Sequence, residues 1–283
     1  MTNAPSHYAP NDAALEEAKL KALQQSISRL QADHAQQSAQ RRAQYAEDAR
    51  IQDRFRDLMF GHLRSKEKME LKQLAEDGRR LSEGRPKLVR PPLLTKGLPI
   101  EPSSATPNAF GMPPPYDFTW TSGSGQGTET ASTDGPIDLA TQAFGERSVG
   151  AGIGFWFPSR EGGARRLGTS INFSYNWSER AMAYVADNHG RVWLTVWGMA
   201  ENGWVGTSGD QSPSWTDHVG WYESHHGIRD GQATQELVFN ARPNSLYACW
   251  LNASLRCHAD HGAFGFAIST AQLNIDLALV WVT

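Results

Sequence analysis

Hydrophobic residues in the N-terminal third of the chain recur at the spacing of an α-helix. Residues 12–83 contain no proline and are rich in Ala, Leu, Gln, Glu, Lys and Arg, which favour helix. The apolar side chains follow steps of three and four residues, as in the seam of a coiled coil. Seven residues carry this seam: Leu20, Leu23, Ile27, Leu30, Ile51, Phe55 and Leu58. We predict a coiled-coil stalk over residues 12–84, preceded by a disordered N-terminus at 1–11.

The middle of this seam is polar where a coiled coil is usually apolar. The same frame places His34, Gln37, Arg41, Gln44 and Asp48 between the two apolar blocks. Two structures fit, namely one continuous helix or a helical hairpin that turns near residues 35–44. That stretch contains no Gly, Pro or Asn, which favours the continuous helix. An isolated helix with an apolar stripe is unstable in water, so we expect it to associate with copies of itself.

The apolar frame slips after Leu58, and a different composition begins after residue 84. Ten of the fifteen prolines lie within residues 86–136, and a Gly/Ser/Thr-rich run follows the triple proline at 113–115. Such segments form extended or flexible connections. We therefore predict a linker over residues 85–136.

From residue 137 onward, apolar and polar residues alternate in short runs, which is typical of β-strands. We expect strands near 149–157, 166–175, 180–186, 191–199, 218–222, 234–240, 246–257, 262–268 and 274–282. The sequences EGGA, DNHG, ENGW, IRDGQ and ARPNS are interpreted as the turns between them. The density of strands leaves no room for crossover helices. It predicts an antiparallel, jelly-roll-like β-sandwich over residues 137–283, so the fold class is α + β in separate segments.

Charge and composition narrow the classes of partner. The formal net charge of -3 is too small to indicate nucleic acid or an anionic membrane as a partner. No run approaches the ~20 apolar residues of a membrane span. The first nineteen residues lack a basic segment followed by an apolar one, so we predict no signal peptide and synthesis in the cytoplasm. Non-classical export or incorporation into a larger particle stays open.

Aromatic residues suggest where a ligand binds. All seven lysines precede residue 97, whereas nine of the ten tryptophans follow residue 150. The candidate ligand-binding residues lie in one Gly/Ser/Asp-rich stretch: Trp204, Asp210, Trp215, Asp217, Trp221 and Tyr222. Aromatic rings can stack on sugars while carboxylates accept hydrogen bonds from hydroxyl groups. The alternative is that these tryptophans anchor a long loop on the sandwich.

A second cluster has the chemistry of a metal site. Cys257, His258, Asp260 and His261 combine thiolate, imidazole and carboxylate ligands, although the spacings of common zinc sites are absent. The alternative is a polar turn between two strands. Cys249 and Cys257 stand ~26 Å apart along one extended strand, too far for a disulfide, so we expect two reduced thiols. We predict no cofactor.

Signatures of catalysis are weak. There is no G-x-S-x-G motif, and no spacing selects a pair of carboxylates for glycoside hydrolysis. Gly150, Gly152 and Gly154 superficially resemble a phosphate loop, but no helix follows them.

The order of parts, a coiled coil before a β head, is similar to that of trimeric fibre and head proteins, and we expect a homo-oligomer formed through the coiled coil, with a trimer favoured. We predict an oligomeric, non-enzymatic, lectin-like binding protein whose heads present aromatic loops to a glycan, a surface or a protein. The alternatives are a structural component of a fibre-like particle and a metal-dependent enzyme.

Overall fold

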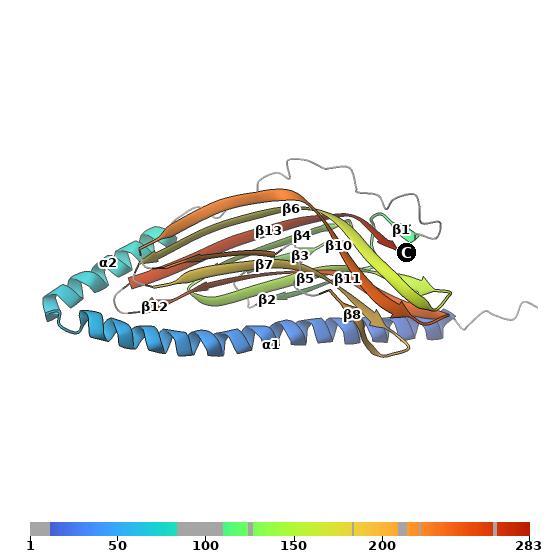
Figure 1. Ribbon diagram of the computed structural model, residues 1–283, viewed down its shortest axis with the longest axis horizontal. Helices are drawn as coiled ribbons and strands as arrows, with labels where there is room; N and C mark the ends of the chain where they lie inside the picture. The colour runs from blue at the N-terminus through green and yellow to red at the C-terminus, as the bar shows by residue number, and fades with distance from the viewer. Residues whose placement is uncertain are drawn as a thin grey trace, which may run out of the picture.

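The protein consists of two helices and a sandwich of two antiparallel β-sheets (Figure 1). The computed structural model describes residues 12–83, 110–123, 127–182, 184–208, 214–220, 222–262 and 265–283. The helices are α1 (Asp12–Phe60) and α2 (Ser65–Glu83). The strands are β1 (Phe110–Met112), β2 (Phe118–Gly123), β3 (Gly127–Ala131), β4 (Pro136–Ala143), β5 (Gly145–Ser159), β6 (Gly163–Met182), β7 (Ala186–Gly198), β8 (Gly203–Thr207), β9 (Ser214–Val219), β10 (Ser224–Ala241), β11 (Ser245–Ala259), β12 (His261–Gly262) and β13 (Gly265–Val282). The predicted fold class is confirmed.

Each sheet combines long strands with shorter ones. Sheet A has seven strands in the order β10-β6-β13-β4-β3, with β1 and β12 also paired to β13. Sheet B has six strands in the order β2-β5-β11-β7-β8, with β9 also paired to β7. The strand expected at 246–257 corresponds to β11, which is central in sheet B because it lies between β5 and β7.

Alternation along β11 separates two environments. Cys249, Leu251 and Cys257 point into the core between the sheets. Both cysteines are free and buried, as expected for two thiols on one strand. Ala248 and Trp250 belong to a second apolar cluster on the outer face of sheet B. This outer face is covered by another part of the same chain.

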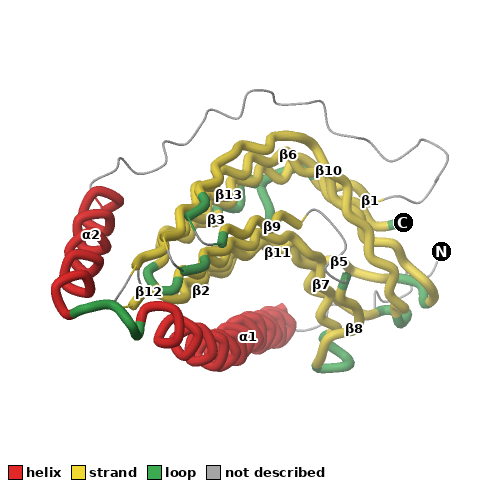
Figure 2. Tube along the Cα trace, turned by 60° about the vertical axis from the view of Figure 1, so that its left-hand side comes forward, coloured by secondary structure: helices red, strands yellow, loops and turns green. Residues whose placement is uncertain are grey.

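Helix α1 lies along the outer face of sheet B, beneath β2, β5, β11 and β7 (Figure 2). The contact is apolar near the start of the helix, where Leu30 is 4% exposed. The cluster comprises Ala22, Leu30, Phe118, Trp120, Trp197, Ala248 and Trp250, with Leu23, Ile27, Trp156, Met199 and Trp204 packed around it. Burial of this many aromatic rings strongly favours attachment of the helix.

The contact is polar further along the helix. Tyr45 stacks on His258 with ring centroids 3.6 Å apart, and its hydroxyl donates a hydrogen bond to Asp187. Arg256 forms an ion pair with Asp187 at 3.1 Å. From Ala22 to Tyr45 a helix rises ~35 Å, and from Ala248 to His258 a strand rises ~33 Å. The two segments therefore have similar lengths and run side by side. Apolar residues of α1 contact apolar residues of β11 at one end, and polar residues contact polar residues at the other.

The glycines of β5 explain how close this contact is. A Cβ at Gly152 would clash with the Trp120 ring, and one at Gly154 would clash with the Phe118 ring. The Trp120 indole instead lies flat enough to donate a hydrogen bond of 2.8 Å to Asn252. The Gly150–Gly154 pattern thus provides room for aromatic rings, and no helix begins after it.

The helical segment is confirmed, with one break. Helix α1 passes through residues 35–44 without a turn, which agrees with the continuous helix expected there. It ends at Phe60, and α2 begins at Ser65, where the Glu67 carboxylate accepts a hydrogen bond from the Arg64 amide at 2.8 Å. The slip in the apolar frame after Leu58 marks this break.

The coiled-coil seam meets two different environments in the single chain. Leu23, Ile27 and Leu30 pack against sheet B of their own chain. We expected these three residues to contact a sister chain. In the structure the tryptophans of sheet B provide the apolar surface that covers them. Leu20 is 56% exposed. In the second half of the seam, Ile51 and Leu58 are 61% and 77% exposed, and Phe55 is 53% exposed.

The predicted linker differs from the structure over its second half. Strands β1, β2 and β3 all lie within residues 110–131, and β4 begins at Pro136. Trp120 and Phe118 explain the difference, because their rings are buried under α1. The sandwich therefore begins before residue 137. Residues 84–109 and the predicted disordered segment 1–11 lie outside the described residues.

Two of the five expected turns are strands. The sequence DNHG (187–190) lies inside β7, and IRDGQ (228–232) lies inside β10. Asn188 is held in the sandwich by hydrogen bonds, accepting one from the Tyr175 hydroxyl and donating one of 2.6 Å to Glu179. Burial raises the pKa of Glu179 to about 8. The hydrogen bonds that water would supply to Asn188 in an exposed turn are supplied here by Tyr175 and Glu179.

Among the described residues, neither helix is long and apolar enough to cross a lipid bilayer.

Candidate functional site

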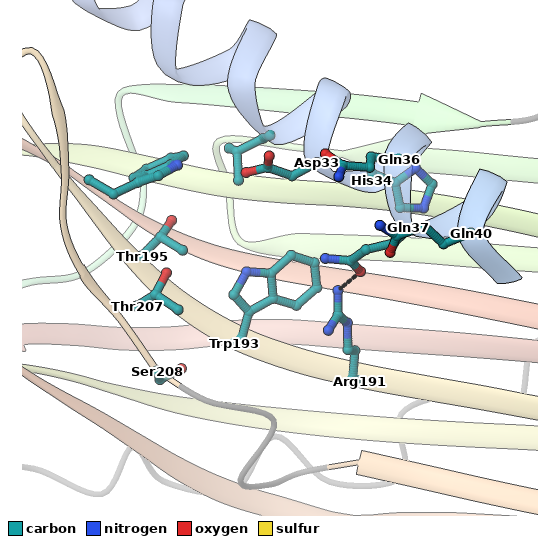
Figure 3. Close-up of a pocket in the computed structure, with 12 residues that line it drawn as sticks. Asp33, His34, Gln36, Gln37, Gln40, Arg191, Trp193, Thr195, Thr207 and Ser208 are labelled. Carbon is teal, nitrogen blue, oxygen red and sulfur yellow. Dashed lines mark hydrogen bonds between the residues drawn. The ribbon is translucent and has the colours of Figure 1, made fainter.

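A groove separates part of α1 from the outer face of β7 and β8 (Figure 3). Its volume is about 470 Å³. It is lined by Leu30, Asp33, His34, Gln36, Gln37, Gln40, Arg191, Trp193, Thr195, Trp204, Thr207 and Ser208. We call this space the α1–β7 groove. It exists because α1 is held against sheet B on one side and β7 carries side chains that alternate outward on the other.

Aromatic rings form the sheet side of the groove. Trp193 projects from β7, and the Arg191 guanidinium lies over its ring at 4.4 Å from the ring centroid. Trp204 meets Trp197 edge to face, with ring centroids 5.0 Å apart. Figure 3 shows Trp193 beside Arg191 and facing the helix. The result is a flat apolar surface next to a cation.

Amide and hydroxyl groups surround these rings. On α1, positions 33, 36, 37 and 40 share one helical face, so that Asp33 and three glutamines line the groove together. On the opposite side, Thr195, Thr207 and Ser208 contribute hydroxyl groups. Gln37 Oε1 accepts a hydrogen bond of 2.6 Å from Arg191, which bridges the two walls. The groove therefore offers both donors and acceptors around an aromatic surface.

His34 closes one end of the groove as a neutral side chain. Its ring nitrogens hydrogen-bond with the Ser148 hydroxyl at 2.6 Å and contact the Ser122 hydroxyl at 3.4 Å. Burial, and secondarily the nearby charge of Arg191, lowers the pKa of His34 from 6.5 to about 4. At neutral pH the imidazole carries no charge.

The structure separates the residues predicted to bind a ligand. Trp204 lines the groove, as described above. Trp215 is instead buried in the core and stacks on Tyr175, with ring centroids 5.3 Å apart. Asp217 accepts a hydrogen bond from the Trp177 indole, and Tyr222 is 66% exposed. Asp210 and Trp221 lie outside the described residues. Of the four candidates that the structure describes, Trp204 is the one that lines the groove.

Several groove residues were missed by the sequence analysis. Trp193 lies in a regular strand rather than in a loop, and Asp33, Gln36 and Gln40 lie on a helix assigned to association. The available signal was the polar middle of the seam, where His34 and Gln37 interrupt the apolar pattern. These two positions line the groove because the helix there faces a polar part of its own sheet.

The proposed metal ligands point in different directions. Cys257 faces the core, where its thiol contacts the Thr141 carbonyl at 3.7 Å, and burial raises its pKa to about 12. The neighbouring His258 faces α1 and hydrogen-bonds with Asp260 at 2.9 Å. His261 lies in β12, and its side chain is outside the description. Within the described residues, no three metal-binding side chains gather at one point. Alternation along β11 separates Cys257 from His258.

Comparison with known proteins gives no family. No protein-family model matches the sequence, and no curated protein matches it.

Several solved structures align with part of this chain at low similarity. TmCBM61 in complex with β-1,4-galactotriose aligns at 12% identity over 57% of this chain and 86% of that chain, with a TM-score of 0.17. The glycoside hydrolase domain of Endo-D from Streptococcus pneumoniae R6 aligns at 7% identity over 58% of this chain and 21% of that chain, with a TM-score of 0.24. Tailspike protein 4 of bacteriophage CBA120 aligns at 10% identity over 60% and 19%, with a TM-score of 0.18. The matched region spans about one fifth of the latter two chains. TM-scores this low give no information on function.

The depressed pKa of His34 predicts a pH-dependent stability. Between pH 6.5 and about 4 the folded chain binds fewer protons at His34 than the unfolded chain does. Stability is therefore lost as the pH falls through this window, by on the order of 3 kcal/mol in total. Denaturant unfolding of the wild type and of His34→Gln, from pH 7.5 to 4, measures the effect. Glu179 titrates in both proteins and cancels in the difference. A difference in unfolding free energy that does not change with pH would contradict the assignment.

Proposed function

We propose that this protein is a non-enzymatic carbohydrate-binding protein and that the α1–β7 groove holds the sugar. The observation that carries the proposal is the Trp193 ring in a groove rimmed by amides and hydroxyls. A pyranose has an apolar face that packs on an aromatic ring and equatorial hydroxyls that need donors and acceptors at its edge. The groove supplies both, and its volume of about 470 Å³ lies within the ~300–1,000 Å³ typical of ligand sites.

The chemistry of the groove favours binding over hydrolysis. Glycoside hydrolysis uses two carboxyl groups on either side of the scissile bond. Among the described residues that line the groove, Asp33 is the one carboxylate, and it forms an ion pair with Arg29 at 3.1 Å. The remaining polar groups are amides, hydroxyls, a neutral imidazole and a guanidinium. Such a set orients a ligand without supplying an acid and base pair.

Removal of the aromatic surface tests the site. A glycan array first identifies an oligosaccharide that the wild type binds, and calorimetry then measures its Kd. We expect Trp193→Ala to weaken binding about tenfold or more, equivalent to ~1.4 kcal/mol, whereas Trp193→Phe keeps part of the affinity. Thr207→Val should weaken binding less, and Thr128→Val, an exposed threonine on β3, serves as the matched control. If Trp193→Ala binds the oligosaccharide with unchanged affinity, the sugar does not bind in the α1–β7 groove.

We further propose that the exposed part of the seam mediates self-association, with a trimer favoured. Ile51, Phe55 and Leu58 keep a four-three spacing on α1 and remain more than half exposed in the single chain. Several copies would present several grooves, so that weak binding at each one is raised by multivalency. The same stripe supports the alternative function, a structural component whose helix joins a larger particle.

A charge placed on this stripe tests self-association. We expect the wild type to sediment as an oligomer and Leu58→Glu to sediment as a monomer, because a carboxylate cannot be buried between helices without a partner. Val238→Glu is the control, since Val238 is 61% exposed and lies on β10, away from the helices. The proposal fails when the wild type is monomeric at all concentrations or when Leu58→Glu leaves its mass unchanged.

A further inference from the structure

A small basic pocket adjoins the α1–β7 groove. Three arginines and three serines contribute to its walls: Arg41, Arg191, Arg256, Ser38, Ser148 and Ser254. It shares His34, Gln37 and Arg191 with the groove, so the two spaces meet along a common wall. Within the described part of the chain, no carboxylate lines this pocket. Three guanidinium groups thus converge on one small space beside the proposed sugar site.

The three arginines differ in their contacts. Arg256 is paired with Asp187 at 3.1 Å. Arg191 donates hydrogen bonds to Gln37 at 2.6 Å and to Ser254 at 3.1 Å, and its guanidinium lies over the Trp193 ring. Arg41 is half-buried on α1. No described carboxylate forms an ion pair with it.

The electrostatics of Arg41 indicate a shortage of negative charge. Burial, followed by the charges of Arg256 and Arg191, lowers the pKa of Arg41 below its ordinary value, and the Glu146 carboxylate offsets only part of this shift. Like charges this close cost free energy unless an anion lies between them. The neutral His34 adds no charge of either sign at pH 7. An anion that enters the pocket would therefore relieve a repulsion that already exists in the folded protein.

We propose that the basic pocket holds an anionic substituent, a carboxylate or a sulfate, of the sugar that occupies the α1–β7 groove. This inference rests on the proposed function and specifies its ligand class as acidic oligosaccharides. The pocket volume of about 20 Å³ is close to the ~10–15 Å³ needed for one water-sized group. It accommodates an anionic oxygen and excludes a second sugar ring. Guanidinium and serine hydroxyl groups are the donors such an oxygen requires.

Matched acidic and neutral oligosaccharides test the ligand class. Calorimetry compares oligogalacturonate with its methyl ester, and 6-sulfated galactan oligomers with unsulfated ones, so that the two arms distinguish carboxylate from sulfate. We expect one acidic member to bind the wild type at least tenfold more tightly than its neutral partner. Arg41→Gln should abolish this preference and keep the affinity for the neutral partner. Arg42→Gln, the adjacent arginine with a 59% exposed side chain, should keep the preference.

A sugar-free measurement separates the pocket from the groove. Sodium sulfate, compared with sodium chloride at equal ionic strength, should raise the melting temperature of the wild type and of Arg42→Gln more than that of Arg41→Gln. Arg41→Gln alone should be at least as stable as the wild type, because it removes a repelled charge.

The possible results have distinct meanings. Equal binding of acidic and neutral sugars, with the same sulfate effect in all three proteins, overturns the anion pocket and leaves the sugar groove standing. A sulfate effect that depends on Arg41, with no binding of any oligosaccharide, keeps an anion pocket but overturns the acidic-sugar inference together with the proposed function. An acidic preference that survives Arg41→Gln places the anion elsewhere and also overturns the inference.

Discussion

The outer face of sheet B and the inner face of α1 must match each other along ~35 Å, and the rest of the molecule depends on this match. Near the start of the helix, Leu30 and its neighbours cover Trp120, Trp197 and Trp250. Without α1 these rings would form an exposed apolar patch, which soluble proteins avoid unless it has a partner. The helix therefore completes a third layer of the sandwich.

The polar half of the contact has a different consequence. Tyr45, Arg256 and Asp187 place polar groups at this contact, where the Tyr45 hydroxyl donates to the Asp187 carboxylate and Arg256 pairs with it. Between the apolar contact and this polar one lie the α1–β7 groove and its basic pocket, which are lined by residues 30–41 of α1 and by Arg191 of β7. Both walls are needed, because Gln37 and Arg191 are 154 residues apart in the sequence and meet only when α1 lies on the sheet.

The sequence predicted the elements better than it predicted their partners. Helical spacing identified α1 because period and composition are local properties of the chain. An apolar stripe such as Leu23–Leu30 indicates that this helix face is buried, but it does not identify the surface that buries it. A sister helix in a coiled coil and a tryptophan-covered sheet are equally compatible with the pattern. The alternation of residues along 246–257 predicted a strand, but no local feature of the sequence indicated that Trp250 faces a helix. The correspondence between helix and strand is recognised only when the apolar and polar residues of Ala22–Tyr45 are compared with those of Ala248–His258 in the folded chain.

The turn expected at 187–190 is part of a strand, and the candidate ligand residues lie apart from one another, for related reasons. Asp, Asn and Gly favour turns when water satisfies them, whereas Asn188 is satisfied by Tyr175 and Glu179 inside the sandwich. Trp215 was grouped with Trp204 by composition, although strand alternation points it into the core. Composition marks a region as aromatic, but the direction of each ring depends on register, which the sheet determines.

Backbone hydrogen exchange of α1, followed over a series of dilutions, tests the central claim most directly. If the helix packs on its own sheet, residues 22–45 stay protected to the same extent at every concentration, and residues 50–60 exchange faster in the dilute protein. Loss of protection across residues 22–45 on dilution would show that sister chains, and not sheet B, cover the helix, and would contradict this account.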